Sequence, residues 1–319
     1  MISSPASSNP SVIHAYGQTL PQMTSGYPRY VSTVQQQPRV YSIYISLNRV
    51  RKGELRTVLD MVIDAGMQPM ICLTAKWTPA EWEVRAAALQ AAGMNDKPID
   101  TQKNWLAARF EFRDEQIAQG VADNELATFA TEIAATPGTV YIRFMQETVT
   151  LYKWECRGPA SFKAAWFRLW GRLPENAQML YHPNAPDPAT MREWMPYNIE
   201  GLAASIFQPS DFTRAAWEAD LAYQFNIPYV LAECAPALGE FAAKGIRTSG
   251  VWNKYFQPYF DLIESGKVAM AVNCSLDWSS DPVFGPKGWP DTEWQSATWF
   301  TRWRLKQAMG QGYWRHGDG

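Results

Sequence analysis

Short apolar runs recur along the chain, each bounded by turn-forming residues. Residues 140–147, VYIRFMQE, follow the break Pro137-Gly138, are rich in β-branched and aromatic side chains, and end in Glu147. This pattern predicts a buried strand with an acid at its C-terminal tip. Residues 227–233, IPYVLAE, have the same form and end in Glu233. Similar runs predict strands at residues 12–17, 39–46, 68–73, 178–181, 201–207 and 268–274.

Segments of helical composition lie between most of these strands. Alternating strands and helices predict a parallel sheet, and eight strands predict closure into a (β/α)8 TIM barrel. A doubly wound open sheet is the structural alternative, but no Gly-rich phosphate loop follows the first strand to support it. A loop is expected between the first two strands, up to Pro38. Helices are expected at residues 54–65, 79–93, 101–120, 124–135, 161–170, 212–225 and 251–263.

The length of 319 residues suits one complete α/β barrel with insertions. A single catalytic domain is therefore expected over residues 12–319. Residues 79–120 form an insertion after the third strand, at the end of a barrel where insertions shape a binding cleft. Residues 1–11 are small and polar, and a disordered or linker-like N-terminus is expected there.

The charges nearly cancel, with 29 lysines and arginines against 31 aspartates and glutamates. No general electrostatic field favours nucleic acid or a membrane as a partner, and no apolar run approaches membrane-spanning length. Aromatic residues are abundant, with 15 tryptophans and 14 tyrosines. This content fits carbohydrate binding, because rings stack on the apolar faces of sugars, and it fits a large aromatic core almost as well.

Four cysteines, Cys72, Cys156, Cys234 and Cys274, show no CxxC spacing. Three of them lie in or beside predicted strands, where a free thiol behaves as a small buried hydrophobe, and no histidine cluster indicates a metal or another cofactor. No signal peptide of the basic-then-apolar type begins at Met1, and the opening MISSPASSNPS resembles a linker remnant. Secretion with the signal removed is favoured over a cytoplasmic location, and both remain open.

Glu147 and Glu233 are the candidate catalytic residues. Cleavage of a glycosidic bond needs one carboxylic acid to protonate the leaving oxygen and one carboxylate to attack or to activate water. The alternative for each is a surface acid in a strand-to-helix loop. Two glutamates at the ends of strands four and seven nevertheless favour a glycosidase pair, since a TIM barrel carries its chemistry at this end of its strands.

A resemblance supports this interpretation. Residues 117–147, IAQGVADNELATFATEIAATPGTVYIRFMQE, resemble the segment of glycoside hydrolase family 26 in which a helix leads into strand four and its acid/base glutamate. AGMQPMICLTAKW, EGLAASIFQP, IPYVLAECAPA and AVNCSLDW agree in order, so the resemblance covers most of the chain from Val12 onward. It implies a retaining (β/α)8 glycosidase of the larger clan, with Glu147 as acid/base and Glu233 as nucleophile.

Three positions depart from the family pattern. Gln146 stands where the family usually has a histidine, and Thr148-Val149-Thr150 replaces the Asn-Gly that tends to follow the acid/base. Gln208 occupies the place of a strand-six tyrosine that often supports the nucleophile. A sugar other than mannose in the cleavage subsite is a reasonable consequence, and Gln146 and Gln208 are candidate substrate-binding residues.

Further candidates lie at the expected barrel mouth. Trp278 is a candidate stacking platform under the sugar, or a core tryptophan. Arg143 shares the face of Glu147 if strand alternation holds, and its cation would keep the nucleophile ionised or form a structural ion pair. His182 follows strand five and is placed to bond a hydroxyl, whereas His14 is expected in the core. Trp77, Tyr152 and Trp154 are candidates for outer subsites, and Asp277 for a sugar hydroxyl or a turn cap.

These observations predict a retaining glycoside hydrolase that cleaves a β-linked polysaccharide by double displacement. β-Mannan is the first substrate through the resemblance alone, with β-1,3- or β-1,4-glucan, xylan or a modified polysaccharide as alternatives. Endo action is expected, and so is a monomer. The competing class is a sugar-binding barrel that has lost catalysis.

Overall fold

The computed structural model describes residues 12–17, 20–76, 79–94, 108, 111–149, 156–236, 241, 244–246, 248–274, 294 and 297–317. Its strands are β1 (Val12–Tyr16), β2 (Val40–Ser46), β3 (Gln68–Thr74), β4 (Val140–Phe144), β5 (Ala177–Tyr181), β6 (Gly201–Ile206), β7 (Tyr229–Cys234), β8 (Val268–Asn273) and β9 (Trp314–Arg315). Its helices are α1 (Leu20–Val34), α2 (Leu47–Arg51), α3 (Glu54–Asp64), α4 (Pro79–Ala91), α6 (Asp114–Gln119), α7 (Asp123–Ala134), α8 (Pro159–Trp170), α9 (Pro188–Trp194), α10 (Asp211–Gln224), α12 (Thr248–Val251), the π-helical segment η1 (Trp252–Phe256), α13 (Gln257–Glu264) and α14 (Trp299–Met309).

The strands form one sheet in the order β2-β3-β4-β5-β6-β7-β8-β1-β9. β1 also pairs with β2 in parallel, through Ala15 with Val40 and Tyr16 with Tyr41. Strands β1 to β8 therefore close on themselves, and the fold is the (β/α)8 barrel that the alternating pattern predicts. The open-sheet alternative is wrong.

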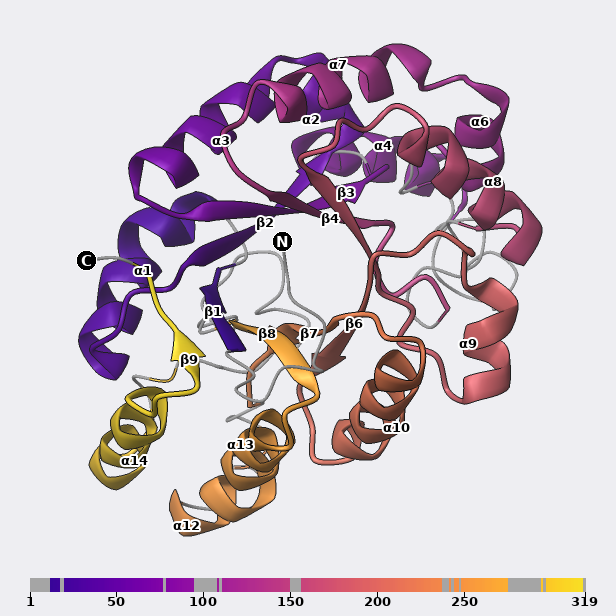
Figure 1. Ribbon diagram of the computed structural model, residues 1–319. Coiled ribbons are helices and arrows are strands. Elements are labelled where there is room, and N and C mark those ends of the chain that lie inside the picture. The colour runs from indigo at the N-terminus through magenta and orange to yellow at the C-terminus, as the bar shows by residue number, and fades with distance from the viewer. Residues whose placement is uncertain are drawn as a thin grey trace. The chain divides into compact units, whose positions relative to one another are not determined.

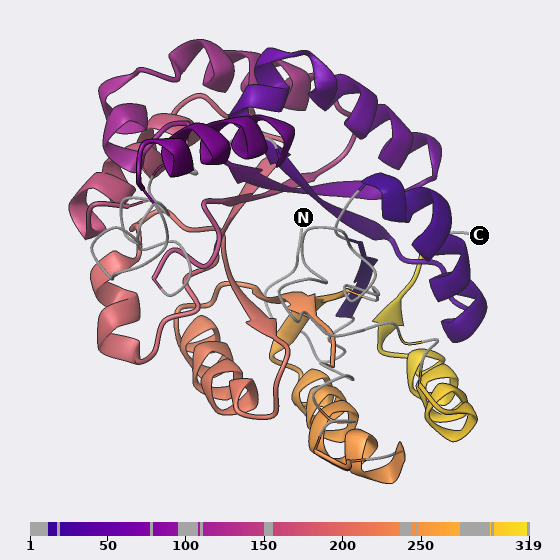
Figure 2. The ribbon, with the colours of Figure 1, turned by 180° about the vertical axis from the view of Figure 1, so that it is seen from behind.

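The chain divides into two compact units. The first contains Met1–Ile43, Val62–Met70 and Glu200–Gly319, and the second contains Tyr44–Met61 and Ile71–Ile199. In the first unit α10 packs against β6 and β7, and α13 against β8 (Figure 1). In the second unit α8 contacts α6 and α9 (Figure 2).

Helical spacing explains how these helices bury one face. In α8 the buried residues are Phe162, Ala165, Trp166 and Leu169, which recur at intervals of three and four. The predicted helices at 54–65, 79–93, 124–135, 161–170 and 212–225 are confirmed within two residues at each end. The helix expected over 101–120 is confirmed only for α6, since residues 111–113 are not helical and residues 101–107 lie outside the described part of the chain.

The prediction of a loop before Pro38 is wrong, because the helix α1 occupies residues 20–34 and contains Pro28. Tyr30 and Val34 are fully buried one helical turn apart. The Tyr30 ring also stacks on Tyr16 of β1, with ring centroids 4.3 Å apart. This packing outweighs the local cost of a proline within the helix.

Other elements, α2 among them, were also not predicted from the sequence. α9 begins at an aspartate cap, where the Asp187 side chain accepts from the Thr190 N–H. η1 interrupts the helix expected over 251–263 with a π-helical turn just before Pro258. α14 and β9 form the aromatic-rich tail, and β9 pairs in parallel with β1.

All four cysteines are free and buried, which confirms the prediction made for the three in or beside strands. None of the helices in the described part of the chain combines the length and the apolar character that a membrane crossing requires. The expected N-terminal segment, residues 1–11, lies outside the described residues.

Candidate active site

The turn after β4 carries Glu147. β4 ends at Phe144, and residues 145–149 follow in non-strand conformation. Met145 and Glu147 both have left-handed backbones, with φ of 49° and 55°. Residues other than glycine seldom adopt this region, and those that do gather at functional sites, where the surrounding structure holds them. The prediction that the strand itself reaches Glu147 is therefore wrong, since the strand ends three residues earlier.

Hydrogen bonds to the neighbouring strand ends hold this turn. The Met145 N–H donates to the carbonyl of Leu73 in β3 (3.0 Å), and the Glu147 N–H donates to the carbonyl of His182, directly after β5 (2.6 Å). Within the turn, the Thr148 hydroxyl donates to the Met145 carbonyl (2.5 Å). The backbone of Glu147 is thus fixed from both sides before any ligand binds.

The Glu147 carboxyl group is buried, with 5% of the residue exposed. Its Oε1 accepts a hydrogen bond from Asn184 Nδ2 at 2.7 Å. Asn184 follows β5 and is itself left-handed, with φ of 47°, a conformation that asparagine tolerates better than most residues. The sequence predictions omit Asn184, and the signal that could have found it is an asparagine just beyond a strand end.

Arg143 and His182 form a buried pair beneath the turn. Arg143 is fully buried in β4, and its Nη1 lies 3.2 Å from His182 Nδ1. A guanidinium group only donates, so Nδ1 accepts and the neutral ring carries its proton on Nε2. The Arg143 guanidinium also lies 5.6 Å from the centre of the Tyr44 ring. Arg143 therefore orients His182, whose carbonyl in turn holds Glu147.

The prediction that Arg143 and Glu147 share a face has the premise that strand alternation continues to Glu147. The strand instead ends at Phe144. That premise is wrong, because the left-handed residues Met145 and Glu147 change the direction of the chain. Gln146 lies between them and is buried, and its Oε1 accepts from the Cys72 thiol at 2.6 Å. The described structure thus brings together four predicted residues: Arg143, Gln146, Glu147 and His182.

Glu233 lies in β7, at an irregular point of the sheet. Leu231 is opposite Ala204 of β6, whereas Glu233 is opposite Ser205, so Ala232 has no partner residue on β6. The pairing of β7 with β8 shifts at the same place. This is a β-bulge, which bends a strand and redirects the side chains that follow it, and such bulges are common beside active sites. Glu233 is 5% exposed.

The strand ends on either side of Glu233 are firmly held. Arg214 Nη2 donates to the Ser205 carbonyl (2.5 Å), and the Tyr255 hydroxyl donates to the Ile206 carbonyl (2.7 Å). The Cys274 N–H donates to the Cys234 carbonyl (2.9 Å). Two side chains therefore anchor β6 beside the bulge, and the residue that follows β8 anchors β7 directly after Glu233.

A buried acid lies behind β7, on α10. Glu218 is fully buried, and burial raises the pKa of its carboxyl to about 8, although Arg214 and a hydrogen bond with the Tyr229 hydroxyl act in the opposite direction. The Tyr229 hydroxyl and Glu218 Oε2 are 3.2 Å apart. Arg214 Nε lies 3.8 Å from Glu218 Oε1. Glu218 is thus mostly protonated at neutral pH, a state that no sequence pattern predicts.

The remaining predicted residues divide into two groups. Gln208 follows β6 and is exposed, and its N–H donates to Asp211 Oδ2 (2.9 Å) at the start of α10. The other candidates lie outside the described residues: Trp77, Tyr152, Trp154, Asp277 and Trp278.

His14 belongs to a buried chain of hydrogen bonds, as its predicted core position requires. His316 Nε2 lies 3.0 Å from the Met309 carbonyl, so it donates, and in a neutral ring its Nδ1 accepts from His14 Nδ1 (3.0 Å). His14 Nε2 then accepts from the Tyr30 hydroxyl (2.7 Å), which accepts from Asn273 Nδ2 (2.8 Å). Burial, followed by the proximity of His316, lowers the pKa of His14 to about 3.

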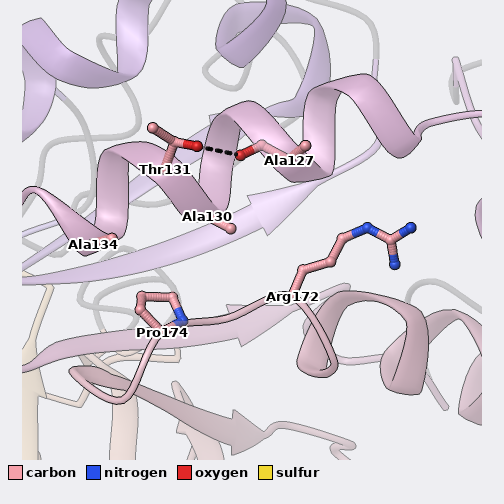
Figure 3. Close-up of a pocket in the computed structure, with 6 residues that line it drawn as sticks. All are labelled: Ala127, Ala130, Thr131, Ala134, Arg172 and Pro174. Atoms are coloured by element: carbon pink, nitrogen blue, oxygen red, sulfur yellow. Dashed lines mark hydrogen bonds between the residues drawn. The ribbon is translucent and has the colours of Figure 1, made fainter.

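A hollow of about 350 Å³ lies between α7 and the segment that links α8 to β5 in the second unit (Figure 3). It contains no carboxylate and no partner for Glu147, so it is not the candidate active site. Across the described ranges, no three His, Cys, Asp or Glu side chains gather in a way that could hold a metal ion. The hollow is lined by Ala127, Ala130, Thr131, Ala134, Arg172 and Pro174.

Comparisons with known proteins find similarity in three dimensions only. No protein-family model matches the chain, and no curated protein matches it. The structure of GH26A from Muricauda sp. MAR_2010_75 is similar at 12% identity and a TM-score of 0.56, over 97% of this chain and 92% of that one.

Two further solved structures are similar over nearly their whole length. One is the GH26 domain of an endo-β-mannanase/endo-β-glucanase from Prevotella bryantii, at 9% identity and a TM-score of 0.56, over 100% of this chain and 99% of that one. The other is xylanase 10B from Thermotoga maritima, at 10% identity and a TM-score of 0.58, over 94% and 96%. At these identities the likeness shows the fold, and two of the three structures carry the designation GH26.

Proposed function

We propose that the chain is a retaining glycoside hydrolase that cleaves a β-linked polysaccharide. The observation that carries the proposal is a pair of buried glutamates, Glu147 after β4 and Glu233 at the end of β7, in a (β/α)8 barrel. Catalytic residues of this fold come from the C-terminal ends of its strands. The similarity in fold to solved mannanase and xylanase structures supports the same conclusion.

The proposed reaction has two steps that use both carboxyl groups. Glu233 attacks the anomeric carbon while Glu147 gives its proton to the leaving oxygen, and a covalent glycosyl-enzyme forms. Glu147 then takes a proton from water, which attacks the same carbon and releases Glu233. Two inversions give net retention of configuration.

The surroundings of Glu147 fit a group that must hold one orientation through both steps. Its backbone is pinned by the His182 carbonyl, and its side chain accepts from Asn184. Asn184 is therefore proposed to position the acid/base. Stacking of sugar on Trp278, and outer subsites at Trp77, Tyr152 and Trp154, are part of the same proposal, with Gln146, Gln208 and Asp277 as polar contacts.

β-Mannan is the first proposed substrate, with glucan and xylan as alternatives, and endo action is proposed. Release of reducing sugar from a panel of these polysaccharides tests the activity. Retention in native gels that contain a polysaccharide, without any release of reducing sugar, would instead identify a sugar-binding barrel without catalysis.

Two variants separate the proposed roles. Glu147→Gln removes the proton donor, so turnover of polysaccharide is expected to fall by about 10²–10⁴-fold, while substrates with a good leaving group still glycosylate Glu233. Glu233→Ala is expected to abolish turnover, and azide is expected to restore slow cleavage to a glycosyl azide of inverted configuration. Proton NMR that shows inversion in the first wild-type product would contradict the assignment of Glu233.

A further inference from the structure

An exposed aromatic face lies on α14. Trp299 is 71% exposed, Phe300 43% and Trp303 48%. Trp299 and Trp303 are four residues apart, so they lie on one side of the helix about 6 Å apart along its axis. The rings of Phe300 and Trp303 have centroids 6.0 Å apart and are inclined by 31°. These three exposed side chains, Trp299, Phe300 and Trp303, make up the α14 aromatic face.

This face is not the side of α14 that packs on the protein. Thr301, Leu305 and Met309 are the buried residues and recur at intervals of four. Single exposed aromatic side chains are ordinary, but three together on the outward side of a helix leave a contiguous apolar patch of the kind that marks a binding surface.

The helix that carries the face is fixed to its neighbour. The Arg304 guanidinium lies 3.9 Å from the centre of the Trp252 ring in η1 and 5.9 Å from that of Phe300. Trp252 Nε1 donates to Gln257 Oε1 (3.0 Å). Within the first unit α14 also contacts α1 and α12, and Figures 1 and 2 draw it outside the strands. The rings are therefore presented by a rigid element, which lowers the entropic cost of binding.

The charges of α14 indicate the ligand. The helix carries Arg302, Arg304 and Lys306 and no acidic residue. Lys306 is exposed, four residues after Arg302 and three after Trp303, so it lies about one helical turn from each. A ligand that satisfies both features has flat apolar faces for stacking and negative charges between them. A polysaccharide of pyranose rings that bears carboxylates has this chemistry.

We infer that the α14 aromatic face is a second saccharide-binding site, which holds an acidic polysaccharide chain apart from Glu147 and Glu233. Trp299 and Trp303 stack on the pyranose rings, and the exposed side chains of Arg302 and Lys306 interact with carboxylates. The inference extends the proposed glycosidase function and rests on it for the choice of a saccharide. Its role is to keep a long acidic chain on the enzyme between cleavage events, which fits the modified polysaccharide among the predicted substrates rather than neutral mannan.

Native gel electrophoresis with soluble polymers tests this site. Carboxymethyl cellulose is the acidic probe, and hydroxyethyl cellulose is a neutral probe with the same backbone. The expected result is retardation by carboxymethyl cellulose that weakens with salt. The double variant Trp299→Ala/Trp303→Ala should bind about tenfold more weakly, since two stacking contacts are lost. Trp170→Ala is the matched control, because Trp170 is 46% exposed on α8 and should leave retardation unchanged.

Three outcomes would overturn the inference. Equal retardation of the wild type and the double variant, with unchanged circular dichroism spectra, removes the stacking role. Equal retardation by both polymers, unaffected by salt or by Lys306→Gln, removes the acidic ligand. Co-sedimentation with phosphatidylserine vesicles that depends on Trp299 and Trp303, without retardation by either polymer, identifies a membrane surface instead.

The test is independent of catalysis when repeated with Glu233→Ala. Retardation that persists in this variant and is lost with Trp299 and Trp303 supports the second site even where no polysaccharide is cleaved, an outcome that would contradict only the proposed function. Cleavage of polysaccharide without retardation that depends on the tryptophans would contradict only the second site. Hydrolysis of short soluble glycosides should be the same for the wild type and the tryptophan variants.

Discussion

At the scale of single residues, the backbone of Glu147 stands out. A left-handed conformation costs a residue with a Cβ atom roughly 1–2 kcal/mol, and Glu147 adopts it with φ of 55°. The hydrogen bond from its N–H to His182 and the bond from Met145 to Leu73 on the same turn oppose that cost. The turn therefore holds Glu147 in place despite its strained backbone, as expected of a preorganised catalytic group.

The strain predicts a specific order of stability. Glu147→Gly should be more stable than Glu147→Ala by about 1 kcal/mol, because only glycine adopts the left-handed region without a steric cost. Urea denaturation of the two variants measures this difference. Asp60 in the middle of α3 is a control, where glycine should be less stable than alanine by about 1 kcal/mol. A lower stability for Glu147→Gly than for Glu147→Ala would show that the backbone is not strained.

Asn184 provides a second test at this scale. Asn184→Gly keeps a residue that accepts the φ of 47° but removes the donor to Glu147. The kcat on polysaccharide should fall by about tenfold, because this hydrogen bond contributes about 0.5–1.5 kcal/mol while Glu147 is protonated and about 1.5–3 kcal/mol once it is ionised. Asn226→Gly is matched, since Asn226 has φ of 53° after α10, and it should keep full kcat. Equal kcat in both variants would remove Asn184 from the site.

The sequence predicts Glu147 and Glu233 as candidates because each ends an apolar run, and that signal depends only on the order of residues. It does not predict the contact of Asn184 with Glu147, and its placement of Arg143 on the face of Glu147 assumes a regular strand. Both have one cause, since side-chain direction beyond a strand end depends on φ and ψ. A period of two applies only while the chain remains extended.

At the scale of elements, the bulge in β7 determines the direction of Glu233. Ala232 is the extra residue, and it is fully buried. Deletion of Ala232 should restore a regular ladder and turn the Glu233 side chain to the opposite face. Activity should be lost, and circular dichroism should show whether the barrel still forms. Ala232→Gly keeps the bulge and should retain activity, and an active deletion variant would show that the bulge does not direct Glu233.

The elements that the sequence missed also have physical explanations. The eight barrel strands have buried apolar runs, and their predicted bounds agree with the structure within about two residues, except at the C-terminal end of β4. α1 was missed because Pro28 signals a break, whereas Tyr30 and Val34 pack tightly enough to keep the helix. α14 was missed because its outward side carries Trp299 and Trp303, which obscures the helical period.

At the scale of the whole molecule, two buried groups link stability to pH with opposite sign. His14 has a pKa of about 3 in the folded chain against 6.5 when unfolded. Below pH 6.5 the unfolded chain binds the proton and the folded chain does not, so His14 lowers stability as the pH falls from 6.5 to 3. The lowered pKa of His316, caused mainly by its burial, acts in the same direction.

Glu218 acts in the opposite way. Its pKa is about 8 in the folded chain against 4.5 when unfolded, so the folded chain binds the extra proton between these values, and its contribution to stability is lost as the pH rises from 4.5 to 8. The two contributions oppose each other between pH 4.5 and 6.5, where each changes by about 1.4 kcal/mol per pH unit. Their sum should be nearly level in that interval and fall on both sides of it.

Urea denaturation at each half pH unit tests this balance through two variants. Glu218→Gln keeps a neutral side chain of the same shape, so its stability relative to the wild type should rise with pH between 4.5 and 8 by about 1.4 kcal/mol per pH unit. His14→Gln removes the titrating ring, so its relative stability should instead rise as the pH falls from 6.5 to 3. The constant cost of each substitution cancels, since only the slope with pH is compared. A difference between Glu218→Gln and the wild type that does not change with pH would show that Glu218 is ionised in the folded barrel, with Arg214 as its partner.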